Sequence, residues 1–410
     1  MLARILGWLA AALIAIGAGL ASYAISNQVK SPAKVVGLGI LPDANASGNF
    51  ALLSLATRKA GDPQATVDKD ERRLALHAYR SEPLSASSVA LMAVPMTGRA
   101  EAAARQKLLE LAGRLTRRSA FVSSELINAA GRRDDEAQIF QWLSRVMLTS
   151  PDVRKIYGAA MADATAKEGA VAALTPILGA EPSWANYYWR LVVGRPASLV
   201  NAARLRSAIA RAPWRQTEIL STDLRMMRRL AAAGEFEVAY QLAHDLGLRR
   251  SGSIAKNLLT NGDFASAPAM PPFDWDLAAL GNLGASIDTD QEQLAISAIA
   301  GARGSAARQL VPLSPGSYRL AWSLSAGSPF PPGALSARIG CAEAGAGESL
   351  TAVVPLVEGK RQVPVDIRDQ SCAWYWVSID TNIPDDSMGV DAQIENFSLI
   401  ASGPDPANRR

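Results

Sequence analysis

The chain has 410 residues, of which 49% are hydrophobic and 20% are charged. This length allows two ordinary domains that each bury a core, and the composition excludes a disordered chain. The formal net charge is +4, but residues 257–400 hold seven Lys or Arg against sixteen Asp or Glu. A basic first part therefore precedes an acidic second part, and the two parts are expected to attract each other or to face different partners.

An apolar run extends from Ile5 to Ile25. It is long enough to cross a bilayer and long for the apolar core of a signal peptide. We therefore predict a retained transmembrane signal anchor over residues 1–27, in a chain that crosses the membrane once. The alternative is a signal peptide cleaved after Ala21 or Ala24, where small residues have the required spacing.

A linker and a helical domain are expected to follow the apolar run. Residues 28–46 contain Pro32, Pro42 and several Gly, which predicts a short linker. From residue 47 to residue 252, apolar residues recur at spacings of three and four, which is the helical period. Breakers such as Gly and Ser-Pro separate these runs, so the region is expected to consist of successive helical hairpins.

Two segments of this region share a turn motif. The Gly at position 131 precedes Ala137 and a closing Pro151, and Gly234 precedes Ala239 in the same way. This pattern resembles the tetratricopeptide repeat, in which a Gly turn precedes an Ala where two helices touch. The resemblance implies an α-solenoid of stacked hairpins with a concave surface for a protein partner. A compact all-α domain is the alternative.

The helical region is also rich in arginine and in one aromatic cluster. Residues 99–133 hold eight Lys or Arg against three Asp or Glu, and residues 190–229 hold nine against two. The simpler interpretation is a solvated helical face, and the alternative is a basic groove for an acidic partner. Nucleic acid is not expected, because no recognition helix or RNA-binding signature is present. The cluster Trp184, Tyr187, Tyr188 and Trp189 is interpreted as helix core, with a ligand platform as the alternative.

From residue 257 the apolar period changes to two, which is the period of β-strands. Strands are expected at 317–324, 334–341, 350–357, 361–367, 372–380 and 390–400, with Pro- and Gly-rich turns between them. This pattern predicts an all-β sandwich of the jelly-roll type over residues 257–402. Residues 403–410 are expected to form a disordered tail.

The two cysteines of the chain, Cys341 and Cys372, both fall in this strand-rich part. Two thiols behind an export segment predict one disulfide, which would enclose about 30 residues and contribute ~3 kcal/mol. The alternative is a pair of buried free thiols in a cytosolic protein. No Cys or His pattern suits a metal, so no metal site is predicted.

The entry to the sandwich carries a motif. It contains Asn-Gly-Asp-Phe at 261–264, a Pro-rich turn, and then Phe273 and Trp275. This stretch resembles the entry segment of galactose-binding-like carbohydrate-binding modules, which implies a glycan ligand and makes Trp275 a candidate ligand contact. The family's acidic calcium ligand is replaced by Ala265, and Glu395-Asn396 stand where Asp is common in its closing strand. These departures argue against a structural calcium, so no cofactor is expected.

Two further tryptophans are candidate ligand contacts. Trp374 and Trp376 alternate with Tyr375 and Val377 along one predicted strand. If the β-branched face is the core, both tryptophans face outward, and an exposed pair of indole rings would suit a sugar. The alternative is that both rings pack against a loop or against the disulfide, since Cys372 shares their face.

No catalytic constellation is visible in the sequence. The two histidines, His77 and His244, lie in helical stretches without a neighbouring Ser, Cys or metal-ligand motif. We therefore predict a non-catalytic scaffold, anchored in a bacterial inner membrane with its bulk in the periplasm. Its helical part would bind an envelope protein and its sandwich a polysaccharide, in exopolysaccharide assembly or export. The alternatives are a purely protein-binding scaffold with a structural sandwich, and a glycan-active enzyme that uses loop carboxylates such as Asp380, Asp385, Asp386 and Asp391.

Overall fold

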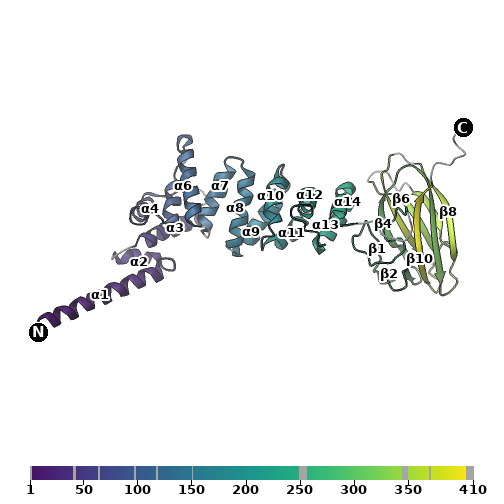
Figure 1. Cartoon of the computed structure of the whole chain (residues 1–410), viewed down its shortest axis with the longest axis horizontal. Helices are drawn as coiled ribbons and strands as arrows, with labels where there is room; N and C mark the ends of the chain where they lie inside the picture. The colour runs from purple at the N-terminus through teal and green to yellow at the C-terminus, as the bar shows by residue number, and fades with distance from the viewer. Residues whose placement is uncertain are drawn as a thin grey trace. The chain divides into compact units, whose positions relative to one another are not determined.

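A computed structural model of the chain describes residues 2–39, 43–62, 65–96, 98–116, 119–149, 151–248, 256–343, 350–368 and 371–402. Within these residues, fourteen α-helices precede two antiparallel sheets that form a β-sandwich (Figure 1). The predicted fold class, a helical region followed by an all-β sandwich, is confirmed. The predicted tail at 403–410 lies outside the described residues.

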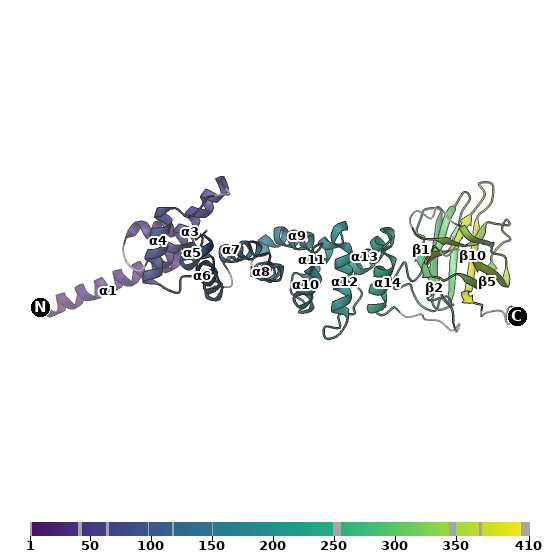
Figure 2. The same cartoon turned by 90° about the horizontal axis from the view of Figure 1, so that it is seen from above.

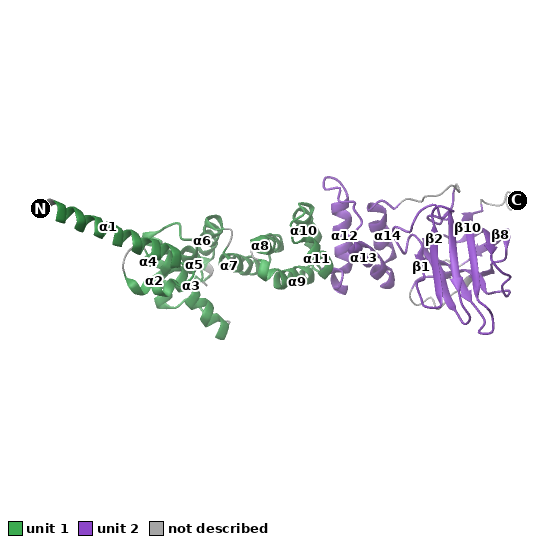
Figure 3. Cartoon of the chain, turned by 90° about the horizontal axis from the view of Figure 1, so that it is seen from below, with its two compact units in different colours: residues 1–191 green, residues 192–410 purple. Residues whose placement is uncertain are grey.

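The chain divides into two compact units, residues 1–191 and residues 192–410 (Figure 3). The last three helices therefore group with the sandwich, whereas the sequence placed the domain boundary between residues 252 and 257. Within the second unit, aromatic residues of the last helix pack on the first sheet of the sandwich.

The first unit is helical (Figure 2). Its helices are α1 (Leu2–Asn27), α2 (Pro32–Leu38), α3 (Ala44–Gly61), α4 (Lys69–Ser81), α5 (Ala86–Ala93), α6 (Ala102–Leu115), α7 (Ala120–Gly131), α8 (Glu136–Thr149), α9 (Arg154–Ala164), α10 (Ala170–Gly179) and α11 (Ala185–Val192), which ends at the unit boundary. Helices that follow one another in the sequence pack against each other, as in the pairs α3 with α4, α5 with α6 and α7 with α8.

Helix α1 contains the predicted apolar segment. The stretch Arg4–Asn27 has a mean hydropathy of 2.0, and it is long and apolar enough to cross a membrane. At the end of α1, Ala24 is buried in a small cluster with Val35 of α2 and Ala46 of α3. The linker expected at 28–46 is therefore corrected: it contains α2 and the start of α3, because Pro32 opens a helix whose Val35 is buried.

The helices of the first unit pack closely where small or aromatic residues meet. A Cβ atom on Gly113 of α6 would lie 2.9 Å from Trp142 of α8, so any larger residue would force the Trp142 ring to shift. Tyr188 and Trp184 of the aromatic cluster are buried, and the Tyr188 hydroxyl lies 2.8 Å from Thr165 Oγ1. Burial also raises the pKa of Tyr188. The interpretation of this cluster as helix core agrees with these positions.

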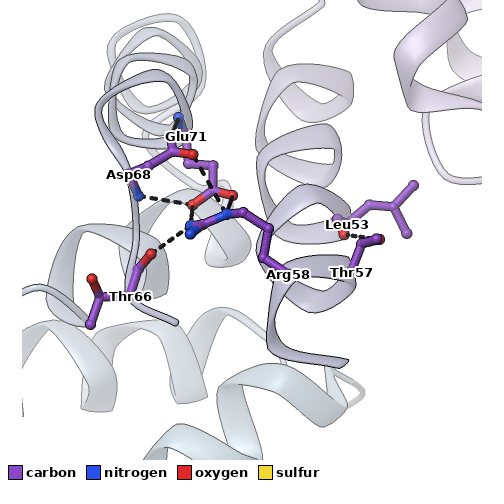
Figure 4. A network of polar contacts seen from close by, with 6 residues as sticks. All are labelled: Leu53, Thr57, Arg58, Thr66, Asp68 and Glu71. Carbon is purple, nitrogen blue, oxygen red and sulfur yellow. Dashed lines mark hydrogen bonds and ion pairs between the residues drawn. The ribbon is translucent and has the colours of Figure 1, made fainter. Parts of the chain in front are cut away.

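A buried carboxylate links α3 to α4 (Figure 4). Glu71 is 1% exposed, and its two oxygens accept hydrogen bonds from Arg58 at 3.0 and 2.5 Å. The backbone N–H of Asp68 also donates to Glu71, while the Asp68 side chain caps the first turn of α4. The Glu71 carboxylate therefore accepts hydrogen bonds both from the backbone at the start of α4 and from Arg58 of α3.

The second unit begins with three helices, α12 (Leu199–Ala210), α13 (Ser221–Ala232) and α14 (Phe236–Asp245). A buried ion pair joins α12 to α13. Arg206 donates two hydrogen bonds to Asp223 at 3.0 and 3.1 Å, and both side chains are almost fully buried. Arg206 also donates to the carbonyls of Gln216 and Glu218, which fixes the connection between the helices.

The strands agree closely with the expected ranges. They are β1 (Asp276–Leu277), β2 (Leu283–Asp288), β3 (Gln293–Ala298), β4 (Arg303–Pro312), β5 (Gly316–Ala326), β6 (Leu335–Cys341), β7 (Leu350–Pro355), β8 (Gly359–Ile367), β9 (Trp374–Asn382) and β10 (Val390–Ala401). The first sheet has the order β1-β4-β9-β6-β7, and the second has the order β2-β3-β10-β5-β8.

The predicted disulfide is confirmed. Cys341 at the end of β6 is bonded to Cys372 just before β9, with their Cα atoms 6.0 Å apart. The two sheets enclose a core to which Tyr375, Val377 and Ile379 of β9 contribute, as the alternation along this strand predicts. Each sheet therefore presents its other face outward, and these two outer faces are the places to search for a binding site.

Candidate functional site

Trp275, one of the three predicted ligand contacts, belongs to the core. It is 0% exposed and packs against Phe264 and Phe397. Its indole N–H donates to the carbonyl of Asn261 at 2.9 Å. The Asn-Gly-Asp-Phe segment that carried the family resemblance thus holds an internal tryptophan, and the expectation that Trp275 contacts a ligand is corrected.

Trp374 does face outward from the first sheet, but another part of the chain covers it. Its ring contacts Phe236 and Tyr240 of α14 with centroid separations of 6.0 and 5.4 Å. Phe273 packs on the same ring at 6.0 Å, and Trp374 is 7% exposed. Its role as a ligand contact is corrected in the same way, because the ring face predicted for a sugar is occupied by the helix.

Trp376 is the predicted residue that stays half-buried on this face. The guanidinium carbon of Arg308 lies 4.6 Å from the centroid of its ring, so a cation stacks on the indole. Asp276 holds this arginine at 3.2 Å and also contacts Arg228 of α13 at 3.4 Å. A sugar could stack on the covered face of Trp376 only if Arg308 moved.

The entry segment does not provide the calcium ligands of the family it resembles. Ala265 offers no side-chain oxygen, and the Glu395 carboxylate accepts a hydrogen bond from Ser323 on the second sheet. Among the described residues, the cluster with metal-ligand atoms is Cys341, Glu343 and Cys372, and both of its sulfurs form the disulfide. Ala265 supplies none of the carboxylate oxygens that a calcium ion prefers, and this cluster supplies those of Glu343 alone.

Hydrogen bonds hold the entry segment in place. Asp274 is 4% exposed and accepts backbone hydrogen bonds from Ala269 and Trp275 at 2.9 and 2.8 Å. Burial raises the pKa of Asp274, against the opposing effect of these donors. Gly262 is required in the same segment, because a Cβ atom there would lie 2.3 Å from the Phe397 carbonyl.

A hollow of about 520 Å³ lies on the second sheet of the sandwich. Its floor follows β5, where the outward residues Ala321 and Ser323 are small. Three of the four residues that pair with them on the neighbouring strands are longer and form the sides: Asn396 of β10, and Lys360 and Gln362 of β8. We call this hollow the β5 groove; it is lined by Ala321, Trp322, Ser323, Lys360, Arg361, Gln362, Asn396 and Ser398.

The register of the strands explains this shape. Ser323 pairs with Asn396 on one side and with Lys360 on the other, so the three side chains stand in one row. Ala321 lies between Ser398 and Gln362 in the next row. Small residues on the central strand and longer ones on its neighbours leave a depression over β5.

The chemistry of the β5 groove is polar. Its lining offers hydroxyls, two carboxamides and the ammonium group of Lys360, whereas Trp322 is 4% exposed and donates its indole N–H to the Val357 carbonyl. Carboxamides and hydroxyls both donate and accept hydrogen bonds, as sugar hydroxyls do. An apolar ligand would gain little here, because the lining lacks the aromatic walls that such ligands require.

Two sets of described residues carry groups that could do acid–base chemistry, one at α3 and one in the sandwich. Asp43 accepts a hydrogen bond from Ser47 at 3.0 Å, and its other oxygen lies 3.0 Å from His77 Nε2. The carboxylate stands between hydroxyl and imidazole, so the imidazole does not activate the serine. In the sandwich, Asp380 lies on β9 of the first sheet and Asp391 lies on β10 of the second sheet. Two of the four candidate loop carboxylates therefore lie on different sheets.

The sequence did not single out the β5 groove, for one reason. The search for aromatic rings led to Trp374 and Trp376, whereas the hollow is lined by Ser323, Gln362 and Asn396, which look like ordinary solvated positions. One signal was present: small outward residues along the predicted strand 317–324. Its significance depends on strand pairing, which one strand alone does not reveal.

Comparisons with known proteins give limited likenesses. No family model matches the chain, and no curated protein matches it. Among solved structures, a CBM4 chain has 13% identity and a TM-score of 0.28, and the match covers 35% of this chain and 99% of that chain. TmCBM61, solved in complex with β-1,4-galactotriose, has 14% identity and a TM-score of 0.25, with 36% and 100% of the two chains covered. Because both TM-scores lie below 0.5, these likenesses do not identify a ligand for this chain.

Proposed function

We propose that this chain is a non-catalytic, membrane-tethered scaffold whose sandwich binds a glycan in the β5 groove. The observation that carries the proposal is the groove itself, an open hollow of about 520 Å³ lined by hydroxyl and carboxamide side chains and the ammonium group of Lys360. Its volume lies in the range of ordinary ligand sites, and its open form along a strand suits an extended polymer.

The remaining parts of the proposal concern the tether and the partner. Helix α1 anchors the chain in a bacterial inner membrane, and the disulfide Cys341–Cys372 accords with a periplasmic body. The helical region binds an envelope protein, so that the chain brings a glycan and a protein together in polysaccharide assembly or export. The role in polysaccharide assembly or export is proposed by analogy, from the combination of a membrane helix, a helical region and a sandwich in one chain.

The test is affinity electrophoresis of the full chain in detergent, through gels cast with neutral and acidic polysaccharides. We expect retardation by at least one polysaccharide, and its loss when Gln362→Ala and Asn396→Ala are combined. Both side chains are exposed, so the variant should fold. Asn382→Ala, at the exposed end of β9 on the other sheet, is the matched control and should migrate as the unmodified chain does.

Two other outcomes would replace the proposal. Loss of retardation in Trp376→Ala, with the groove variant unaffected, would place the site on the first sheet at the predicted tryptophan. Free migration of the folded chain in every gel would leave the purely protein-binding scaffold, and the sandwich would then be structural.

A further inference from the structure

We propose that the segment directly after the apolar helix α1 docks on the bilayer surface and binds anionic phospholipid head groups. This inference rests on the membrane tether of the proposed function, and it adds the surface and the class of lipid that the tether contacts. The surface consists of Val29 and Lys30 in the turn after α1 and of Lys34 and Leu38 on α2, which are all exposed. We call it the juxtamembrane surface.

The packing at the end of α1 sets the depth of this surface. The apolar run from Ile5 to Ile25 spans about 30 Å at 1.5 Å per residue, which matches the hydrocarbon core of a bilayer. Ala24 therefore lies at the edge of the hydrocarbon layer. Because Ala24 is buried against Val35 of α2 and Ala46 of α3, both helices meet α1 at that depth (Figure 1).

A hydrogen bond and buried side chains tie α1 to the two helices that follow it. The side chain of Asn49 on α3 donates to the Gln28 carbonyl at 3.0 Å. Pro32 and Val35 are buried, so one side of α2 packs against the rest of the fold. The opposite side of α2 is therefore held next to the bilayer by contacts within the chain.

The exposed side chains have the chemistry of a membrane interface. Lys34 and Leu38 are four residues apart and share one face of α2, beside the buried Val35. Val29 is 74% exposed and Leu38 is 45% exposed, so the fold leaves two large apolar side chains outside its core. The boundary of a bilayer would bury both, while lysine stems extend along it and keep their ammonium groups at the phosphates.

The charge of this part of the chain favours an anionic bilayer. Residues 1–61 contain one acidic residue, Asp43, against five basic residues. Asp43 accepts a hydrogen bond from Ser47 and lies 3.0 Å from Nε2 of His77, so other parts of the fold engage its carboxylate. Two of the basic residues, on α3, pair with carboxylates of other helices. Lys30 and Lys34 lie beside the membrane end of α1, where each adds attraction for anionic lipid.

Spin labels test whether the juxtamembrane surface touches lipid. Leu38→Cys is labelled in the full chain with the disulfide Cys341–Cys372 intact, in nanodiscs of phosphatidylcholine and phosphatidylglycerol in equal parts. Oxygen concentrates in lipid and a nickel chelate stays in water, so we expect oxygen to relax the label at position 38 more strongly. Leu84→Cys is the matched control, because Leu84 is 69% exposed between α4 and α5. Its label should respond more strongly to nickel.

The lipids that copurify with the chain report the head-group preference. The full chain is extracted in polymer-bounded discs from bilayers of the same two lipids, and mass spectrometry counts both lipids. We expect phosphatidylglycerol to be enriched about two- to fivefold over the bulk ratio, and to return to that ratio when Lys30→Gln and Lys34→Gln are combined. Lys155→Gln, at an exposed position of α9, is the matched control and should retain the enrichment.

Alkaline extraction of membranes comes first, because it separates the tether from the inference. A chain released by alkali would overturn both. In a chain that stays in the membrane, equal access of nickel to positions 38 and 84 would overturn the inference alone. Shielding of position 38 from both reagents would also overturn it, because a protein surface would then cover α2. Absence of enrichment, or enrichment that survives loss of both lysines, would overturn the binding of anionic lipid by Lys30 and Lys34.

Discussion

The two tryptophans of β9 that face away from the core, Trp374 and Trp376, differ in what covers them, and this difference can be tested residue by residue. Trp374 is 7% exposed beneath Phe236, Tyr240 and Phe273, whereas Trp376 is half-buried beneath one guanidinium. We expect Trp374→Ala to lower the free energy of unfolding by about 3 to 5 kcal/mol, because it empties a packed site.

Trp376→Ala serves as the comparison, with an expected loss of about 1 kcal/mol. Chemical unfolding of the full chain in detergent, followed by tryptophan fluorescence and circular dichroism, measures both variants. Equal and small losses for the two would show that α14 does not pack on the sandwich as described.

Glu71 predicts a dependence of stability on pH. Burial acts to raise its pKa, but the hydrogen bonds from Arg58 and from the Asp68 backbone outweigh it, so the pKa lies below the ordinary value of 4.5. An acid whose pKa is lowered by folding stabilises the fold above its unfolded pKa, and this stabilisation is lost as the pH falls through its folded pKa.

We therefore expect Glu71→Gln to destabilise the helical unit at pH 7 by about 1 to 3 kcal/mol. The gap to the unmodified chain should close as the pH falls below about 4.5. Calorimetry at several pH values measures it, with the exposed neighbour Asp70→Asn as the control. A gap that stays constant with pH would mean that the ionised carboxylate is not the stabilising form.

At the scale of elements, the two-residue apolar period and the turn residues predicted the bounds of most strands closely. The range 334–341 was expected and β6 is Leu335–Cys341; the range 390–400 was expected and β10 is Val390–Ala401. The alternation along β9 also indicated correctly that Tyr375, Val377 and Ile379 face the core. These features are local, because each depends on the order of residues within one strand.

What could not be predicted depends on contacts between distant parts of the chain. That Trp374 faces outward follows from its own strand, but its cover by Tyr240 involves a helix more than a hundred residues away. The β5 groove likewise requires the pairing of Ser323 with Lys360 and Asn396 from two other strands. Helix α2 was missed for a different reason: Pro32 was taken as a breaker, although proline is favoured in the first turn of a helix.

At the scale of the whole molecule, the end of α1 bears on whether the apolar helix is retained. Ala24 is buried against Val35 and Ala46, and the side chain of Asn49 donates to the Gln28 carbonyl at 3.0 Å. Cleavage after Ala24 would separate this residue from the cluster. We therefore expect α1 to remain as an anchor.

The intact mass of the purified protein, together with extraction of membranes at alkaline pH, tests this expectation. The anchor predicts a chain that keeps its apolar helix and stays in the membrane fraction. A soluble chain that starts at Ser22 or Ile25 would contradict it and would show that the segment acts as a cleaved signal peptide.

The central claim is that the outer face of the second sheet binds a glycan, and hydrogen–deuterium exchange locates such a contact without any substitution. The full chain in detergent is labelled with and without an excess of a polysaccharide that retards it. We predict slower exchange in peptides from β5, β8 and β10, which line the groove, and unchanged exchange in β4 and β9. Slower exchange confined to β4 and β9, or no change in the sandwich at all, would contradict the claim.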